Sequence, residues 1–198
     1  MSNEGDSFDN RNDLRLDPIE INIGEDLVSL FDINRGGTML NQLHTCRREV
    51  ASEMGFILPT IRVRDRSVLG KTEYVFLIDG HRVDEGRVNL DSCRTTEPEA
   101  VILSHFLDVM RKHAGDILTV DLTQGLLNIL SETSPVVVSE LVSCVLKVGQ
   151  VHKVLQLLLK ERLSIKRLGT ILGTLLEFGE DTKDPVVLCE HVRQRLVR

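Results

Sequence analysis

The spacing of apolar residues along this 198-residue chain changes near residue 90 from a mixed pattern to a purely helical one. Before that point, Ile19, Ile21 and Ile23 alternate with polar residues, and a period of two predicts a strand with one buried face. After it, apolar residues recur every three or four positions, which is the period of an amphipathic helix. The change predicts an α+β protein, with a small α/β subdomain over residues 18–90 followed by an all-α helical bundle over residues 96–198.

Within the first part, one helix is expected after Gly36-Gly37. Its apolar residues follow spacings of three, four and seven up to Met54. Gly55 can terminate this helix in a left-handed conformation. Pro59 then separates the helix from a strand in which apolar and arginine residues alternate.

A β-hairpin is expected at the end of the first part. Tyr74, Phe76 and Ile78 share one face of a strand, because side chains alternate along an extended backbone. The Asp79-Gly80 dipeptide that follows favours a tight turn. The chain is therefore predicted to return as a second strand between Val83 and Val88.

The second part contains regular helix start and stop signals. Small polar residues, some followed by proline, precede apolar runs and are typical N-caps. They predict five to seven helices joined by short loops. The predicted caps are Thr96 (with Glu99 in a capping box), Asp121, Ser134, Ser164 and Asp184, and the predicted ends include Gly149 and Gly179.

Composition and charge exclude several classes of protein. A net charge of -6 argues against nucleic-acid binding, which needs a basic face. No segment approaches the roughly 20 apolar residues of a membrane-spanning helix. Residues 1–17 are polar and acidic, without the apolar core of a secretory signal, and are predicted to be a disordered leader. These features indicate a cytosolic chain.

No cofactor or metal is expected. The Gly70-Lys71-Thr72 tripeptide matches the end of a phosphate-binding P-loop, but Asp65 stands where the first glycine is required. A strand follows the tripeptide, whereas a P-loop opens a helix. The four cysteines are widely separated and form no CxxC pair, so neither a zinc site nor a redox dithiol is indicated.

Nucleophile and base residues occur close together at three places. At spacings of one or two residues on a helix, such side chains diverge and cannot share a proton. Residues far apart in the sequence could still meet, so an unrecognised hydrolase remains an alternative. The three pairs are His44 with Cys46, Ser104 with His105, and Cys189 with His191.

The order of motifs resembles the cytoplasmic part of the FHIPEP family of flagellar and type III secretion export gates. That family has an "IRR" helix, then "ELGF", a proline turn and an "RIRD" strand. Its helical part contains "VIATHL" and "VLQxLLxExVSIRDLRTILE" segments. The corresponding segments here are Cys46-Arg47-Arg48, Glu53-Met54-Gly55-Phe56, Pro59, Arg62-Val63-Arg64-Asp65, "AVILSHFLDVMRKHAGDIL" and "VHKVLQLLLKERLSIKRLGTIL".

This sequence also departs from the family. Members carry an upstream membrane half, an inserted α/β subdomain with a "DPxFGLPA" segment, and a C-terminal α/β subdomain. Only the residues near Leu90 to Pro98 stand in place of the insertion, and the sequence stops at Arg198. The resemblance implies a chaperone-docking dimple, formed partly by the missing segment and partly by the threonine of "ATHL". Ser104 matches that threonine, so half of the expected site is absent.

Two groups of residues are candidates for protein contacts. Arg62, Arg64 and Arg66 line one face of a strand, either as a solvated face or as a docking patch for an acidic partner. The second group is a candidate for self-association and consists of Lys166, Arg167, Gly169 and Gly173. Within it, Gly169 and Gly173 form a small-xxx-small pair, and a close helix crossing, inside the bundle or between subunits, would offset their cost in a helix.

The resemblance implies a non-enzymatic protein-interaction module of a flagellar or type III export apparatus. Its expected partners are export components, chaperones or secretion substrates, with self-association as in the family's rings. Its expected location is the cytoplasm, or the inner membrane periphery through the apparatus. The alternative is a standalone regulatory or sequestering protein that derives from the family and has no direct role in secretion.

Overall fold

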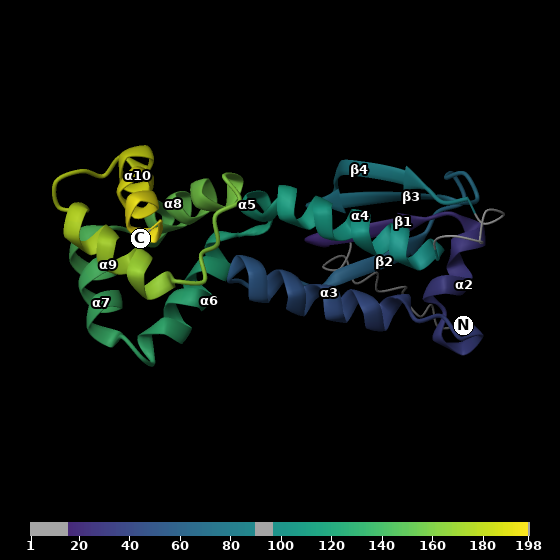
Figure 1. The fold of residues 1–198 in the computed structure, drawn as a ribbon, viewed down its shortest axis with the longest axis horizontal. Coiled ribbons are helices and arrows are strands. Elements are labelled where there is room, and N and C mark those ends of the chain that lie inside the picture. The colour runs from purple at the N-terminus through teal and green to yellow at the C-terminus, as the bar shows by residue number, and fades with distance from the viewer. Residues whose placement is uncertain (1–15, 90–96, 198) are drawn as a thin grey trace, which may run out of the picture.

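A computed structural model describes residues 16–89 and 97–197 of the chain. The molecule is elongated, with a β-sheet at one end and a helical bundle at the other (Figure 1). Two long helices, α3 (Met39–Met54) and α4 (Pro98–Lys112), run side by side between the two ends. The predicted α+β class is confirmed. The leader prediction falls almost entirely outside the described residues, and the subdomain boundaries stay predictions.

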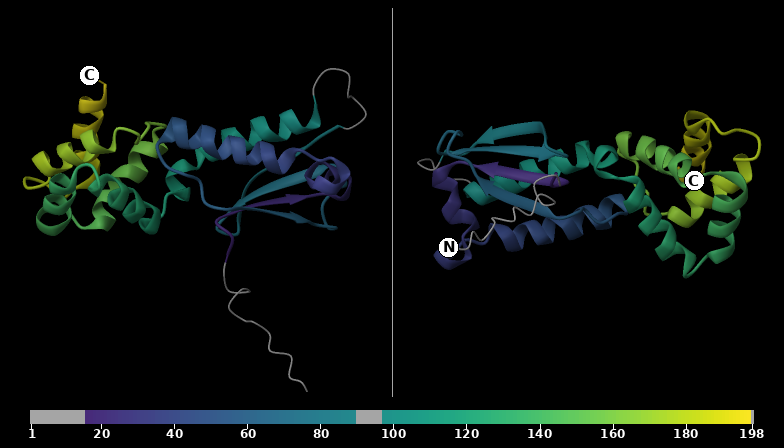
Figure 2. Two further views of the ribbon diagram at one scale, coloured as in Figure 1. Left: turned by 90° about the horizontal axis from the view of Figure 1, so that it is seen from below. Right: turned by 180° about the vertical axis from the view of Figure 1, so that it is seen from behind.

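The sheet has four strands in the order β2-β1-β3-β4. Strand β1 (Ile19–Ile23) pairs in parallel with β2 (Ile61–Asp65) and antiparallel with β3 (Glu73–Ile78), which pairs antiparallel with β4 (His81–Arg87). Helices α3 and α4 cover one face, and Figure 2 shows the other face without a helix on it. The alternating isoleucines of β1 point to the helices and are almost fully buried.

The predicted hairpin is confirmed. The turn between β3 and β4 places Asp79 at φ 47° and Gly80 at φ 76°. Positive φ at both central residues suits the right-handed twist of a two-residue hairpin, and Asp-Gly accepts it at low cost. The result is that Tyr74, Phe76 and Ile78 are all buried beneath the helices.

The predicted first helix is also confirmed. Three short turns, η1 (Glu25–Leu27), α2 (Val28–Phe31) and η2 (Ile33–Arg35), lead from β1 into α3. Gly55 ends α3 at φ 93°, as a left-handed C-cap. Helix α3 is tied to α4 by Arg111, whose guanidinium donates to Glu53 at 2.9 Å and to Glu49 at 3.0 Å.

The helical part continues from α4 to the end of the chain. Within residues 97–197 there are seven α-helices, in agreement with the predicted number. Strong N-cap signals were predicted correctly at Ser134 and Asp184, and the Asp184 carboxylate accepts from the Val186 N–H at 2.9 Å. The remaining elements are α5 (Ala114–Ile117), α6 (Val120–Ser131), α7 (Pro135–Glu140), the π-turn η3 (Leu141–Val145), α8 (Val148–Lys160), α9 (Leu168–Phe178) and α10 (Pro185–Leu196).

Two predicted helix starts were wrong. Helix α6 begins two residues earlier than expected, because Thr119 is its N-cap and accepts from the Leu122 N–H at 3.1 Å. Asp121 lies in the first turn instead. Helix α9 begins after Arg167 and not at Ser164, because Ile165 is buried and its N–H donates to the Met54 carbonyl at 2.9 Å. That bond holds the segment outside the helix.

Two other boundaries also differ from the predictions. Gly149 lies inside α8, since the chain breaks at Leu146 and Lys147, where the backbone is extended. Helix α4 has Glu97 at its N-cap with Pro98 following, so the predicted capping box does not define its start. Thr96 itself lies outside the described residues.

The α6 cap gives a test of the corrected boundary. Replacing Thr119 with Ala should lower the free energy of unfolding by about 0.5–2 kcal/mol, because the Leu122 N–H loses its partner. Replacing Asp121 with Ala should cost less, about 0.3–1 kcal/mol, since it removes only a charge near the helix N-terminus. Urea denaturation of both variants compares the two. A larger loss for Asp121→Ala would restore the original cap assignment.

No single helix among the described residues is both long and apolar enough to span a membrane. The segment Pro135–Val145 and helix α8 meet that requirement only when counted together, and they are bent by 111° at their junction.

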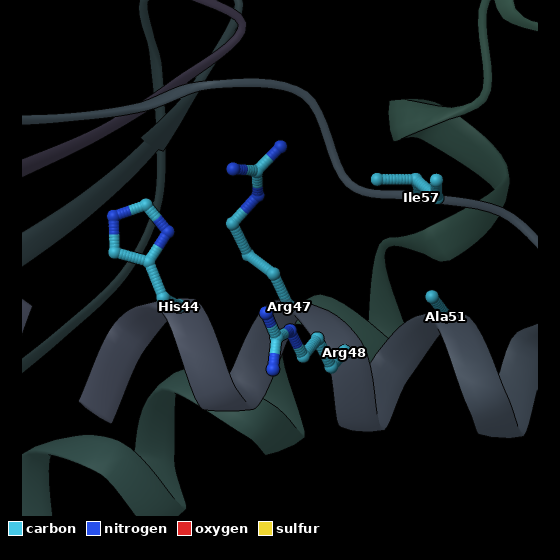
Figure 3. Close-up of a pocket in the computed structure, with 5 residues that line it drawn as sticks. All are labelled: His44, Arg47, Arg48, Ala51 and Ile57. Atoms are coloured by element: carbon cyan, nitrogen blue, oxygen red, sulfur yellow. The ribbon is translucent and has the colours of Figure 1, made fainter. Parts of the chain in front are cut away.

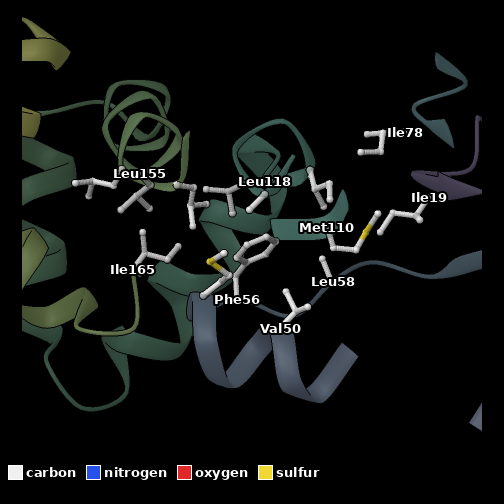
Figure 4. Close-up of a cluster of buried hydrophobic side chains, with 14 of the residues drawn as sticks. Ile19, Val50, Phe56, Leu58, Ile78, Met110, Leu118, Leu155 and Ile165 are labelled. Carbon is white, nitrogen blue, oxygen red and sulfur yellow. The ribbon is translucent and has the colours of Figure 1, made fainter. Parts of the chain in front are cut away.

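One cluster of buried apolar side chains extends through both ends of the molecule (Figure 4). Ile19 and Ile78 contribute from the sheet, Phe56 from the segment after α3, and Leu155 and Ile165 from the bundle. The continuous core holds the surface of α3 in a fixed position relative to the sheet.

Candidate partner-binding site

A basic cleft lies along the outer side of α3 (Figure 3). Its main cavity has a volume of about 480 Å³ and lies between α3 and the segment that follows Gly55. A smaller cavity of about 180 Å³ shares two of its residues and extends toward the start of β2. We call these two cavities the α3 cleft. Its lining residues are Leu40, Leu43, His44, Arg47, Arg48, Ala51, Ile57, Thr60 and Ile61.

The α3 cleft combines positive charge with exposed apolar surface. Two arginines and one histidine line it, and none of the lining residues within the described part of the chain is acidic. Ile57 is 65% exposed at its rim. The cleft therefore offers both cationic and apolar contacts, and arginine is enriched at protein interfaces relative to the rest of the surface.

Arg47 is held in place at the centre of the cleft. Its guanidinium donates to the Leu58 carbonyl from Nη2 at 2.6 Å and from Nε at 3.2 Å. These bonds link α3 to the returning segment without neutralising the charge, because a carbonyl is not an anion. Helix α3 therefore presents the Arg47 guanidinium as a cation in a fixed position. The neighbouring Arg48 is exposed and makes no ion pair with any described residue.

The three arginines predicted as a docking patch lie on the helix-free face of the sheet or just past β2. Arg64 pairs with Asp17 at 2.8 Å and Glu20 at 3.3 Å, and Arg66 pairs with Glu20 at 3.4 Å. Arg62 is exposed and has no ion pair among the described residues. The patch is thus partly neutralised by the chain's own acids, and one of its three charges stays free.

Ser104 lies on the exposed side of α4, and His105 beside it points to the sheet. The His105 Nδ1 is 3.0 Å from the Tyr74 hydroxyl, and its Nε2 is 3.6 Å from Asp84. The ring packs edge-on against Phe76, with centroids 5.2 Å apart. His105 therefore fastens α4 to β3 and β4, and the sequence expectation that Ser104 and His105 diverge is correct.

The predicted self-association residues lie just before α9 and in its first half. Lys166 is exposed, while Arg167 donates to the Leu196 carbonyl of α10 at 3.4 Å. A Cβ added at Gly169 would meet only Leu130 Cδ1, at 3.9 Å, and one at Gly173 would meet nothing within 4 Å. The predicted close crossing inside the bundle is therefore wrong. A crossing between subunits stays a prediction.

The buried thiols are poor candidates for catalysis. Burial raises the pKa of Cys46, and the nearby Glu49 raises it further. Burial likewise raises the pKa of Cys189. Both are therefore protonated near neutral pH, and the thiolate is the nucleophilic form. Among the described residues no group of three or more His, Cys, Asp or Glu side chains could hold a metal ion.

The sequence interpretation did not identify the α3 cleft as a site. Its residues on α3 did give a signal, since the polar His44, Arg47 and Arg48 and the small Ala51 follow helical spacings and share one face. The cavity itself depends on the return of Ile57 over that face, which no local pattern predicts. The contact between His105 and Asp84 likewise joins residues from separate elements.

The fold is shared with solved structures of type III secretion proteins. Chlamydia pneumoniae CdsV aligns with a TM-score of 0.81 over 95% of this chain and 68% of that chain, at 22% identity. The structure described as nonameric EPEC SctV-C aligns with a TM-score of 0.76 over 92% of this chain and 67% of that one, at 20% identity. A second CdsV structure contains CdsO as a complex.

The sequence profile of the FHIPEP family matches residues 2–100 and 89–198. The flagellar biosynthesis protein FlhA of Bacillus subtilis is 31% identical, over 93% of this chain and 34% of its own length. FlhA of Helicobacter pylori is 29% identical, over 93% of this chain and 31% of its own length. This chain belongs to the FHIPEP family, as its motifs indicated.

The chain spans about a third of the length of these curated relatives. The alignment with the Bacillus protein extends over 227 residues, more than the 198 of this chain, so the relative carries additional residues within the matched span. The two profile matches meet at residues 89–100. This is the position at which the motif order predicted a missing insertion.

Proposed function

We propose that this protein is a non-enzymatic interaction module of a flagellar or type III protein export apparatus. It recognises export components, chaperones or secretion substrates, and it acts in the cytoplasm or at the inner membrane periphery through the apparatus. The α3 cleft is the observation that carries this proposal, because it offers fixed cations and exposed apolar surface in a chain related to FlhA. The CdsV structure with CdsO supports a partner from the same apparatus.

Self-association is part of the proposal. The structures described as nonameric for EPEC SctV-C and for the EscV cytosolic domain support it. We assign the contact to the first half of α9 and the residue before its N-cap, because the side chain of Lys166 is exposed and a Cβ added at Gly169 or Gly173 would meet no described atom closer than 3.9 Å. Light scattering of the purified protein measures its mass directly.

A pull-down with a charge-reversed variant tests partner recognition. The whole protein is used as bait in cells that contain an export system, and export components are identified by mass spectrometry. Arg48→Glu should reduce their capture several-fold, because the α3 cleft loses a cation and gains an anion. Arg162→Glu is the matched control, since Arg162 is also exposed, makes no ion pair with described residues and lies in the bundle. Capture of no export component by the unmodified bait would favour the standalone regulator.

A further inference from the structure

We infer that the outer edge of β2 binds an extended acidic segment of a partner protein, which adds to the sheet as a fifth strand. The inference deepens the proposed function and rests on it, because it assigns a chemistry to the segment that the cleft recognises. An exposed strand edge supplies main-chain hydrogen bonds for such an addition, and the flanking side chains select the peptide.

Strand β2 has one edge without a partner strand among the described residues, since it lies at the end of the sheet. The Arg66 N–H donates to the Ile23 carbonyl at 2.9 Å, so the even-numbered residues turn their backbone groups toward β1. The odd-numbered residues, Ile61, Val63 and Asp65, therefore direct their N–H and C=O groups outward. None of these outward groups bonds to another described residue.

Apolar surface lies on the helix side of this edge. The smaller cavity of the α3 cleft is lined by Ile61 of β2 and by Leu40 and Leu43 of α3, with a volume of about 180 Å³. Val63 is half-buried on the same face. A strand placed against β2 would direct every second side chain into this cavity.

Positive charge lies on both sides of the edge. His44, Arg47 and Arg48 stand on the helix side, and Arg62 and Arg64 stand on the helix-free face, where Arg64 is paired with Asp17 and Glu20. Arg62 is unpaired among the described residues, so it is available to an incoming carboxylate. An acidic strand fits this arrangement electrostatically.

The same charges exclude a second copy of β2 as the occupant. Antiparallel pairing of two β2 strands would bring the arginines of one copy against those of the other, and like charges across strands are destabilising. The occupant is therefore a strand that alternates apolar and acidic residues.

A short synthetic strand tests the inference without any export component. The probe is acetyl-Glu-Val-Glu-Val-Glu-Val-Glu-amide with a fluorophore, and binding to the whole protein is followed by fluorescence anisotropy. The valines match the cavity, and the glutamates lie on the face of the sheet that carries the unpaired Arg62. The same peptide with lysine in place of glutamate is the charge control and should not bind.

N-methylation of the peptide separates strand addition from attraction between charges. Methylating the three valine nitrogens blocks one edge of the extended peptide, and methylating the glutamate nitrogens blocks the other, because N–H direction alternates along a strand. One of the two methylated peptides should lose at least about tenfold in affinity while the other stays within about twofold of the parent. In hydrogen exchange, the amides of Val63 and Asp65 should become protected when the parent peptide is bound.

Charge reversal at the strand completes the test. Arg62→Glu should weaken parent binding about tenfold or more, and Arg162→Glu should leave it unchanged. Equal binding of both methylated peptides, or no binding of the parent at millimolar concentration, would overturn the inference. These readouts do not depend on the pull-down, so a failure of strand addition is distinguishable from a failure of the proposed function.

Discussion

Replacing Gly55 with Ala is expected to lower the free energy of unfolding by about 2–5 kcal/mol, which sums a left-handed backbone penalty and an overpacking penalty. Gly55 has φ 93°, and a Cβ there would lie 2.3 Å from the backbone nitrogen of Lys166. Neither backbone can move freely, because the Ile165 N–H is bonded to the Met54 carbonyl at 2.9 Å. Urea denaturation followed by circular dichroism measures the loss.

Gly36 provides a matched control for this effect. It also has positive φ, at 82°, but nothing lies within 4 Å of an added Cβ. Gly36→Ala should therefore show the backbone penalty alone, about 1–2 kcal/mol. If both variants lose the same stability, the close approach between the end of α3 and the segment before α9 does not exist in solution.

Replacing Phe106 with Ala should cost about 3–5 kcal/mol, the usual range for deleting a buried aromatic side chain. Phe106 lies on α4, is 0% exposed and packs edge-on against Phe76 of β3 with centroids 5.8 Å apart. The cavity left behind would lie where the helices cover the sheet. Because the core cluster is continuous, we expect a single unfolding transition at a lower urea concentration.

Ile129→Ala is the control for this core substitution. Ile129 is equally apolar but 63% exposed on α6, so its truncation should change stability by no more than about 0.5 kcal/mol. A second, separate transition in Phe106→Ala would show that the sheet and the bundle unfold independently. If Phe106→Ala lowered the free energy of unfolding by less than Ile129→Ala, the burial of Phe106 would be contradicted.

The sequence predicted some parts of the α3 cleft and missed others. The helix and its C-cap were predicted from apolar spacing and from Gly55, and the arginines of the motif were recognised as part of a family pattern. That pattern did not reveal that Ile57 returns over the polar face of α3. The free edge of β2 was equally hidden, because the order of strands in a sheet depends on which segments pair.

Local chemistry determined much of this fold. The alternating strands, the Asp79-Gly80 turn and the proline-marked helix starts all follow from interactions within a few residues, so the sequence alone predicted them. The order of motifs along the chain also assigned the family.

The tertiary structure decided what depends on contacts between distant segments. Helix α9 begins after Ser164, because Ile165 is buried in the core and its N–H donates to the Met54 carbonyl. The tertiary structure removed the close crossing predicted at Gly169 and Gly173, since no backbone approaches them. It also formed the α3 cleft, whose walls come from a helix, a returning segment and a strand. Local patterns predict which face of an element is buried, but which elements share one core depends on the whole chain.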